Sequence, residues 1–180
     1  MLIKEIFYIP NIIEYIRVGL LIYGIYYKSI VYFIFNYILD IIDGPVARYL
    51  NQTSKLGCFL DHFIDRLTVC IPAIILIYNH NFDIWLLFTI IESFSNIYFN
   101  YFVNTNHMKH TDNNNWLIRT YYSNNRYNIL SYISLVPYFI YSPLIYCTSV
   151  PAYIKHLLQC GVFIYFMIHT QKLKLWVNIY

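Results

Sequence analysis

Runs of about 20 apolar residues occupy nearly all of this 180-residue chain, and this is the length at which an α-helix spans the hydrocarbon core of a bilayer. Hydrophobic residues make up 59% of the chain, charged residues only 12%, and the mean hydropathy is +0.48. Soluble domains carry about a quarter of charged residues. Because a backbone in lipid must satisfy its own hydrogen bonds, long apolar segments of this kind form helices. The sequence therefore predicts an all-α, polytopic membrane protein.

Six membrane-spanning helices can be drawn along the sequence, and they leave no room for a separate soluble domain. Turn-forming residues separate the later spans, and Pro10 and Asn11 form a typical helix start before the first. We expect one domain over residues 1–180. Its spans are predicted at 11–27, 29–48, 55–79, 83–106, 127–147 and 150–171.

The basic residues predict the orientation of these spans. Cytoplasmic loops of membrane proteins carry an excess of lysine and arginine. With the N-terminus in the cytoplasm, two basic residues, Lys28 and Lys155, lie on the far side and eight on the cytoplasmic side: Lys4, Arg48, Lys55, Lys109, Arg119, Arg126, Lys172 and Lys174. The net charge is +3, and the scattered basic residues do not form a nucleic-acid-binding patch.

Four of the nine acidic residues lie between Asp40 and Asp65, in sequence that is otherwise apolar. Carboxylates within a membrane are costly and usually functional. Asp40 and Asp43 are three residues apart, and Asp61 and Asp65 are four apart, so each pair projects from one face of its helix. We expect the two pairs to meet across one site.

Four converging carboxylates require compensating positive charge, which either protons or divalent cations can supply. The all-oxygen ligand set favours Mg²⁺ or Mn²⁺, and four carboxylates suffice for a two-metal centre. Arg48 shares the face of the first pair and is suited to bind a phosphate. Gly44, Ala47 and Gly57 are small enough to let a ligand or a helix approach closely. This combination favours a phosphorylated lipid as the substrate.

A purely structural interpretation treats the aspartates as polar helix ends that pair with Arg48, Lys55 and Arg66. That interpretation suits a single aspartate near the end of a helix. It does not account for four aspartates together with small residues and an arginine at matching helical offsets.

The stretch resembles the signature of the CDP-alcohol phosphatidyltransferase family, D-x2-D-G-x2-A-R-x8-G-x3-D-x3-D. Every fixed position is matched in this chain: Asp40, Asp43, Gly44, Ala47, Arg48, Gly57, Asp61 and Asp65. The family is similar in length and has six membrane helices, so the resemblance can extend over nearly the whole chain.

The resemblance implies a role for each of these residues. Asp40, Asp43, Asp61 and Asp65 would hold two divalent ions, Mg²⁺ or Mn²⁺, and Asp65 would also act as the general base. The residues around them would contact the nucleotide and diphosphate of CDP-diacylglycerol: Gly44, Ala47, Arg48, Ser54 and Gly57.

Within the family, the chain most resembles the eukaryotic branch that uses myo-inositol and releases CMP. The resemblance rests on Asp65-Arg66 and on the Arg119-Thr120-Tyr121-Tyr122 segment that precedes Arg126. It implies a homodimer in the endoplasmic reticulum membrane with the site facing the cytoplasm. Arg119 and Arg126 are candidates for an inositol pocket, although loop charges that bind anionic headgroups would give the same pattern.

Three other functions remain as alternatives. Another acceptor alcohol, such as glycerol 3-phosphate, serine or choline, would use the same chemistry. An ion-relay protein would distribute its carboxylates across the membrane, whereas these four lie near one side, and a prenyltransferase normally separates its two aspartate-rich motifs more widely.

Two residues in the spans need a structural explanation. Pro45 lies inside the motif and lacks an amide hydrogen, so a kink near Asp40 to Asp43 is expected, which would reshape the site or end the helix. Glu14 lies in the first span, where the sequence offers Arg17, three residues later, as its partner.

Overall fold

The described part of the chain folds into helices. The computed structural model describes residues 2–79, 81, 83–101, 116–123 and 128–177, and among these there is no β-strand. The helices are α1 (Leu2–Ile6), α2 (Ile9–Tyr27), α3 (Ile30–Tyr49), α4 (Lys55–Tyr78), α5 (Ile84–Tyr101), α6 (Trp116–Tyr122), α7 (Ile129–Cys147) and α8 (Ala152–Val177).

The six long helices begin and end close to the predicted spans, with two exceptions. The fourth span was predicted to reach residue 106, whereas α5 is described only as far as Tyr101. The last was predicted to end at residue 171, but α8 continues to Val177. The two short helices, α1 and α6, were not predicted, because five or seven residues are too few to display a helical hydrophobic pattern.

Pro45 does not end its helix, because α3 continues past it to Tyr49. The chain then turns at Asn51, which adopts a left-handed conformation (φ 53°) that asparagine tolerates better than most residues. The backbone N–H of Gln52 donates to the carbonyl of Ala47 (2.9 Å) and closes the end of α3. Ser54 caps α4 by accepting a hydrogen bond from the N–H of Gly57 (2.9 Å). This turn fixes how the two halves of the acidic stretch face each other.

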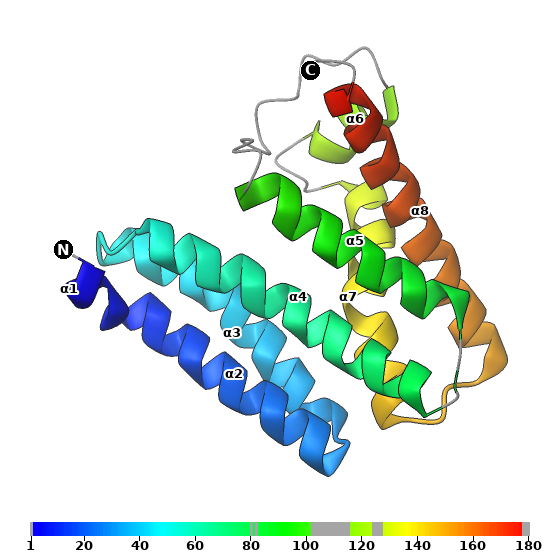
Figure 1. Ribbon diagram of the computed structural model, residues 1–180, viewed down its shortest axis with the longest axis horizontal. Helices are drawn as coiled ribbons and strands as arrows, with labels where there is room; N and C mark the ends of the chain where they lie inside the picture. Colours follow the sequence, from blue (N-terminus) through cyan, green and yellow to red (C-terminus); the bar gives the residue numbers. More distant parts are fainter. Residues whose placement is uncertain (1, 80, 82, 102–115, 124–127, 178–180) are drawn as a thin grey trace.

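The helices form two groups that share α4 (Figure 1). In the first group, α2 packs against α3 and α4. In the second, α4 packs against α5 and α7, while α8 packs against α5 and α7 and carries α6. Because α4 belongs to both groups, a side chain on it can connect the two interiors.

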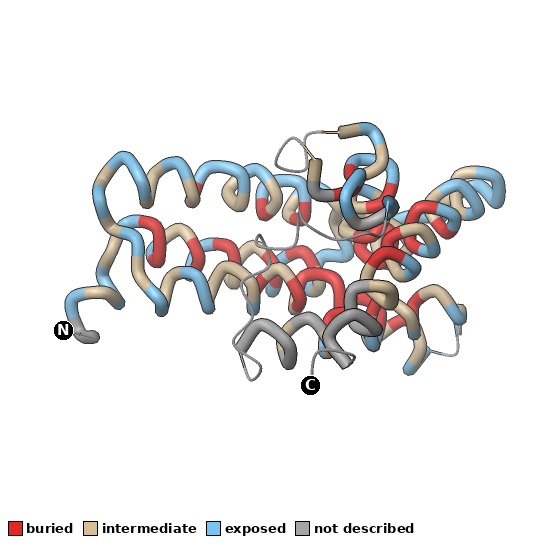
Figure 2. The backbone as a smooth tube through the Cα atoms, turned by 90° about the horizontal axis from the view of Figure 1, so that it is seen from above, coloured by how far each residue is buried: buried red, intermediate tan, exposed pale blue. Residues whose placement is uncertain are grey.

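Both groups bury apolar and polar side chains. In the second group, two apolar clusters form the core, one around Val69, Tyr138 and Ile168 and the other around Ala73, Leu86 and Val162. In the first group, five of the nine buried residues of α2 and α3 are polar or charged: Asn11, Glu14, Arg17, Asn36 and Asp43. Figure 2 shows the buried positions along the inner sides of the helices and the exposed ones outside.

Large apolar side chains are exposed along the outer faces of the helices. On α3, Ile34, Phe35 and Ile41 are 50%, 53% and 73% exposed. A polar interior beneath an apolar surface is the arrangement expected in lipid. Within the described residues, α3 and α7 are long and apolar enough to cross a membrane by the criteria of length and composition. The six-span topology remains a prediction.

Candidate functional site

Five carboxylates from three helices converge in the interior of the first group. Asp40 and Asp43 project from α3, Asp61 and Asp65 from α4, and Glu14 from α2. They form two triads that share one aspartate: Glu14, Asp43 and Asp61 in one, and Asp40, Asp61 and Asp65 in the other. In each triad the ligand oxygens lie within 4.8 Å of one another, so each offers a divalent cation three oxygen ligands.

Arg17 lies at the centre of these carboxylates and is fully buried. Its Nη1 donates to both carboxylate oxygens of Glu14 (2.8 and 3.0 Å) and lies 3.3 Å from Asp43 and 3.5 Å from Asp61. Its Nη2 lies 2.7 Å from Asp40 and 2.5 Å from Asp65. One guanidinium therefore reaches all five carboxylates.

The backbone and side chain of Arg17 are held by Asn36 of α3, which is also fully buried. The Asn36 amide donates to the carbonyl oxygen of Arg17 (2.7 Å), and its Oδ1 accepts a hydrogen bond from Arg17 Nε (3.4 Å). These two bonds join α2 to α3 beside the carboxylates and restrict the orientation of the guanidinium.

The expected pairing of Glu14 with Arg17 is confirmed by this geometry. The sequence gave no indication that Arg17 would meet the aspartates, which lie 23 to 48 residues further along the chain. Its position inside an apolar span was the available signal, because an ionisable residue there generally has a buried partner.

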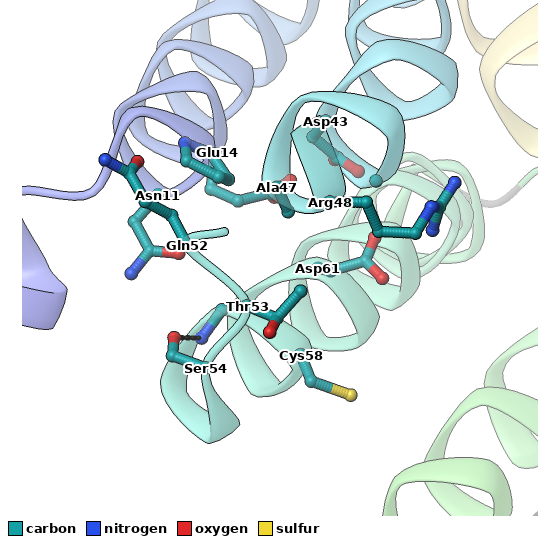
Figure 3. Close-up of a pocket in the computed structure, with 13 residues that line it drawn as sticks. Asn11, Glu14, Asp43, Ala47, Arg48, Gln52, Thr53, Ser54, Cys58 and Asp61 are labelled. Atoms are coloured by element: carbon teal, nitrogen blue, oxygen red, sulfur yellow. Dashed lines mark hydrogen bonds between the residues drawn. The ribbon is translucent and has the colours of Figure 1, made fainter. Parts of the chain in front are cut away.

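An open cavity lies beside the first triad (Figure 3). The cavity is partly open to solvent, and ≈ 180 Å³ of it can hold water-sized molecules. Its lining includes every residue expected to contact CDP-diacylglycerol: Gly44, Ala47, Arg48, Ser54 and Gly57. Asp43 and Asp61 also line it, so a ligand in the cavity would be next to the carboxylates.

Small residues and Arg48 shape this cavity. A Cβ at Gly57 would lie 2.7 Å from Asn11 Oδ1, so any larger residue here would have to displace the Asn11 amide. Arg48 is exposed, and its guanidinium extends over Gly44, where a Cβ would lie 3.4 Å from Nη1. In the part of the chain that the structure describes, Arg48 forms no ion pair, which leaves its donors available to an anion.

Asn11, Gln52 and Thr53 are among the lining residues that the sequence did not indicate as ligand contacts. Asn11, from the start of α2, is 1% exposed and donates to the carbonyl of Glu5 (2.6 Å). Gln52 and Thr53 come from the turn between α3 and α4, where Gln52 accepts a hydrogen bond from the N–H of Ile9 (2.9 Å). Pro10-Asn11 was interpreted only as a helix start, so its place at the site was missed.

The role of the two candidate inositol residues stays a prediction. Arg119 is an exposed residue of α6, which packs on α7 and α8, and Arg126 lies outside the described residues.

A second buried ionic network adjoins the site through Arg66, the residue after Asp65. Arg66 Nη1 lies 3.6 Å from Glu92 of α5 and donates to the hydroxyl of Tyr138 (3.2 Å). His169 of α8 lies 3.2 Å from Glu92. This network connects α4, α5, α7 and α8, and the sequence did not predict it.

The carboxylates fit the divalent metals that the family signature implies. The donors are all oxygens, they form two triads with a shared member, and four of them are the signature aspartates. A buried cation, Arg17, already lies among them, which indicates that this site attracts positive charge.

The chain is similar in sequence to known enzymes that transfer a phosphatidyl group. No solved structure matches the chain. A CDP-diacylglycerol–inositol 3-phosphatidyltransferase of Schizosaccharomyces pombe is 26% identical over 132 residues, which cover 67% of this chain and 56% of that protein. One from Arabidopsis thaliana is 33% identical over 129 residues, covering 65% of this chain and 56% of that protein. The same enzyme of Drosophila melanogaster is 27% identical over 158 residues, covering 79% and 70%.

The chain thus spans little more than half the length of the first two relatives. The family comparison extends further, because the model for CDP-alcohol phosphatidyltransferases matches residues 5–178 and so includes the four aspartates, the cavity and all the long helices to their described ends. The chain belongs to the CDP-alcohol phosphatidyltransferase family.

Proposed function

We propose that this protein synthesises phosphatidylinositol by transferring the phosphatidyl group of CDP-diacylglycerol to myo-inositol, with release of CMP. The proposal rests on one observation above all: two carboxylate triads border a cavity whose walls carry the small residues and the arginine of the family signature. The inositol acceptor is supported by the relatives, which are named for that alcohol.

In the proposed reaction, a hydroxyl oxygen of inositol attacks the lipid-side phosphorus of CDP-diacylglycerol. The new phosphorus–oxygen bond forms as the bond to the CMP oxygen breaks, and the hydroxyl proton passes to Asp65. Arg48 binds the diphosphate, while Gly44, Ala47, Ser54 and Gly57 shape the space for the nucleotide. When bound, two Mg²⁺ or Mn²⁺ ions would offset negative charge on the diphosphate and the leaving group.

We further propose a single domain with six membrane-spanning helices and a cytoplasmic site. The apolar outer surface, the polar interior and the two helices that meet the criteria for a span support a location in lipid. The excess of basic residues on the N-terminal side supports the orientation. The family resemblance supports a homodimer in the endoplasmic reticulum membrane.

The decisive experiment supplies membranes that contain the protein with CDP-diacylglycerol, Mn²⁺ or Mg²⁺, and a panel of labelled alcohols. We expect labelled lipid and CMP with inositol. We expect at least about a hundredfold loss in Asp61→Asn, because Asp61 belongs to both triads. Glu5→Gln is the matched control, since Glu5 forms no ion pair within the described residues and does not line the cavity.

Each other outcome would point to a different function. Lipid label from glycerol 3-phosphate, serine or choline but not from inositol would replace the acceptor. Full activity in Asp61→Asn, or no CMP release with any alcohol, would contradict the enzymatic proposal itself.

A further inference from the structure

The two terminal nitrogens of Arg17 divide between the two carboxylate triads. Nη1 contacts the three members of the first triad: Glu14, Asp43 and Asp61. Nη2 contacts Asp40 and Asp65, the two unshared members of the second triad. Each nitrogen thus contacts carboxylates that would ligate a divalent ion in its triad.

Arg17 and the divalent ions therefore compete for the same oxygens. A guanidinium N–H and a metal ion both require a carboxylate lone pair, and the two cations repel each other at such short separations in a buried site. Arg17 cannot keep all five partners when both triads hold ions.

Charge balance suggests where Arg17 would go. The five carboxylates carry five negative charges when ionised, and the guanidinium together with two divalent ions carries five positive charges. If Glu14 keeps Arg17, Asp43 and Asp61 remain as the protein ligands of the first ion, and the four aspartates balance two divalent ions. Buried charges are tolerated when they are paired in this way.

The structure provides partners that would retain Arg17 away from the aspartates. Glu14 lies one helical turn earlier on α2 and binds Nη1 through both of its oxygens (2.8 and 3.0 Å). Asn36 accepts from Nε and donates to the Arg17 carbonyl, and both Glu14 and Asn36 are at most 2% exposed. These contacts would keep Nη1 and Nε paired when the aspartates take up ions.

We propose that Arg17 is an internal counter-cation that holds the aspartates together before metal binds and withdraws onto Glu14 and Asn36 as divalent ions enter. Arg17 is in this sense a positioning residue. The inference rests on the proposed metal-dependent function, but it concerns the chain before substrate arrives.

The test measures metal binding and stability in the purified full-length protein, without substrate. In Arg17→Gln the competing cation is gone, so Mn²⁺ should bind about tenfold more tightly than in the wild type, measured by electron paramagnetic resonance of free Mn²⁺. The same variant should unfold at a lower temperature than the wild type in EDTA, and saturating Mn²⁺ should narrow that difference.

Glu14→Gln provides the opposite change. Without its anchor, Arg17 stays on the aspartates, so Mn²⁺ should bind more weakly than in the wild type. Because Glu14 is also a member of the first triad, loss of a ligand would weaken binding too, and the double variant separates the two causes. Glu14→Gln combined with Arg17→Gln should bind Mn²⁺ more tightly than Glu14→Gln alone. If Arg17→Gln fails to fold even with Mn²⁺, Arg17→Lys carries the test. Its single ammonium cannot reach both triads and should also bind Mn²⁺ more tightly than wild type.

Weaker Mn²⁺ binding in the arginine variants would overturn the proposal, because it would mean that Arg17 only builds the site. Asp61→Asn separates this failure from that of the proposed function. If wild-type protein binds Mn²⁺ no better than Asp61→Asn, the metal-dependent function fails as well. If wild-type protein binds Mn²⁺ better than Asp61→Asn but the Arg17 variants do not bind it more tightly than wild type, the Arg17 proposal fails and the proposed metal site stands.

Discussion

Gly57 shows how much the site depends on a missing side chain. It lies in the first turn of α4, where its N–H is bound by Ser54 and its α-carbon faces Asn11 of α2. The glycine is needed for this close approach and not for its backbone conformation, since no glycine of the described chain has a positive φ.

Replacement of Gly57 by alanine is expected to impair binding of CDP-diacylglycerol. The new Cβ would lie 2.7 Å from Asn11 Oδ1 and 3.2 Å from Ser54 Oγ, so the Asn11 side chain or the start of α4 must move into the cavity. We expect the KM for CDP-diacylglycerol to rise about tenfold or more, a cost of about 1.4 kcal/mol, in a CMP-release assay.

Gly19→Ala is the matched control for this change. Gly19 lies inside α2, and a Cβ there meets nothing within 4 Å. The substitution should leave the KM unchanged and stabilise the helix by about 0.5–1 kcal/mol. An unchanged KM in Gly57→Ala would show that the nucleotide binds elsewhere.

At the scale of the elements, Asp83 connects α5, α7 and α8 through hydrogen bonds and an ion pair. It lies at the end of the molecule away from the α3–α4 turn. Asp83 precedes α5 and caps it by accepting from the N–H of Trp85 (3.0 Å). Its Oδ2 accepts from Tyr141 of α7 (2.6 Å) and lies 2.8 Å from Lys155 Nζ of α8. Gln159 of α8 donates to the same oxygen (3.0 Å).

This junction predicts a dependence of stability on pH. Burial opposes ionisation of Asp83, but the donors from Lys155, Tyr141 and Trp85 outweigh it and lower the pKa of Asp83 below its usual value of 3.8. A lowered pKa in the folded state stabilises the protein above the unfolded pKa, and this contribution disappears as the pH falls through the folded value.

The measurement compares wild type with Asp83→Asn in thermal unfolding between pH 7 and pH 3. Asparagine cannot ionise, so the variant should unfold at a lower temperature at pH 7, and the difference should shrink below about pH 4. A difference that stays constant over this range would mean that the Asp83 charge contributes nothing.

At the scale of the whole molecule, the apolar outer surface predicts that α4 crosses a membrane, with its two ends on opposite sides. The 24 residues of α4 extend about 36 Å, enough to cross the hydrocarbon core. Asn51, in the turn before α4, and Asn79, at its end, are both exposed.

Cysteines introduced at these two positions should differ in accessibility. In a background with the four native cysteines replaced by serine, a membrane-impermeant maleimide on sealed microsomes, whose outer face is the cytoplasmic one, should label Asn51→Cys, because the basic residues predict that turn in the cytoplasm. Asn79→Cys should be labelled only after the vesicles are opened. Equal labelling of both in sealed vesicles would contradict the proposed topology.

The aspartates could be predicted from sequence because their spacing of three and four residues follows the helical period. Gly44 and Arg48 follow from the same period along α3. Arg17 could not be predicted in this way, since its contacts with Asp40 and Asp65 cross between helices and depend on how α2 packs. The network of Arg66, Glu92 and His169 is non-local for the same reason.

The forked contact of Arg17 has a consequence for how the protein would respond to its metal supply. An ion entering either triad displaces the same guanidinium, so most of that rearrangement is complete before the second ion arrives. We expect the two ions to load cooperatively, with a Hill coefficient that rises toward the number of sites. The site would then fill over a narrow range of metal concentration. Below that range Arg17 would pair with the carboxylates, and above it both ions would be bound.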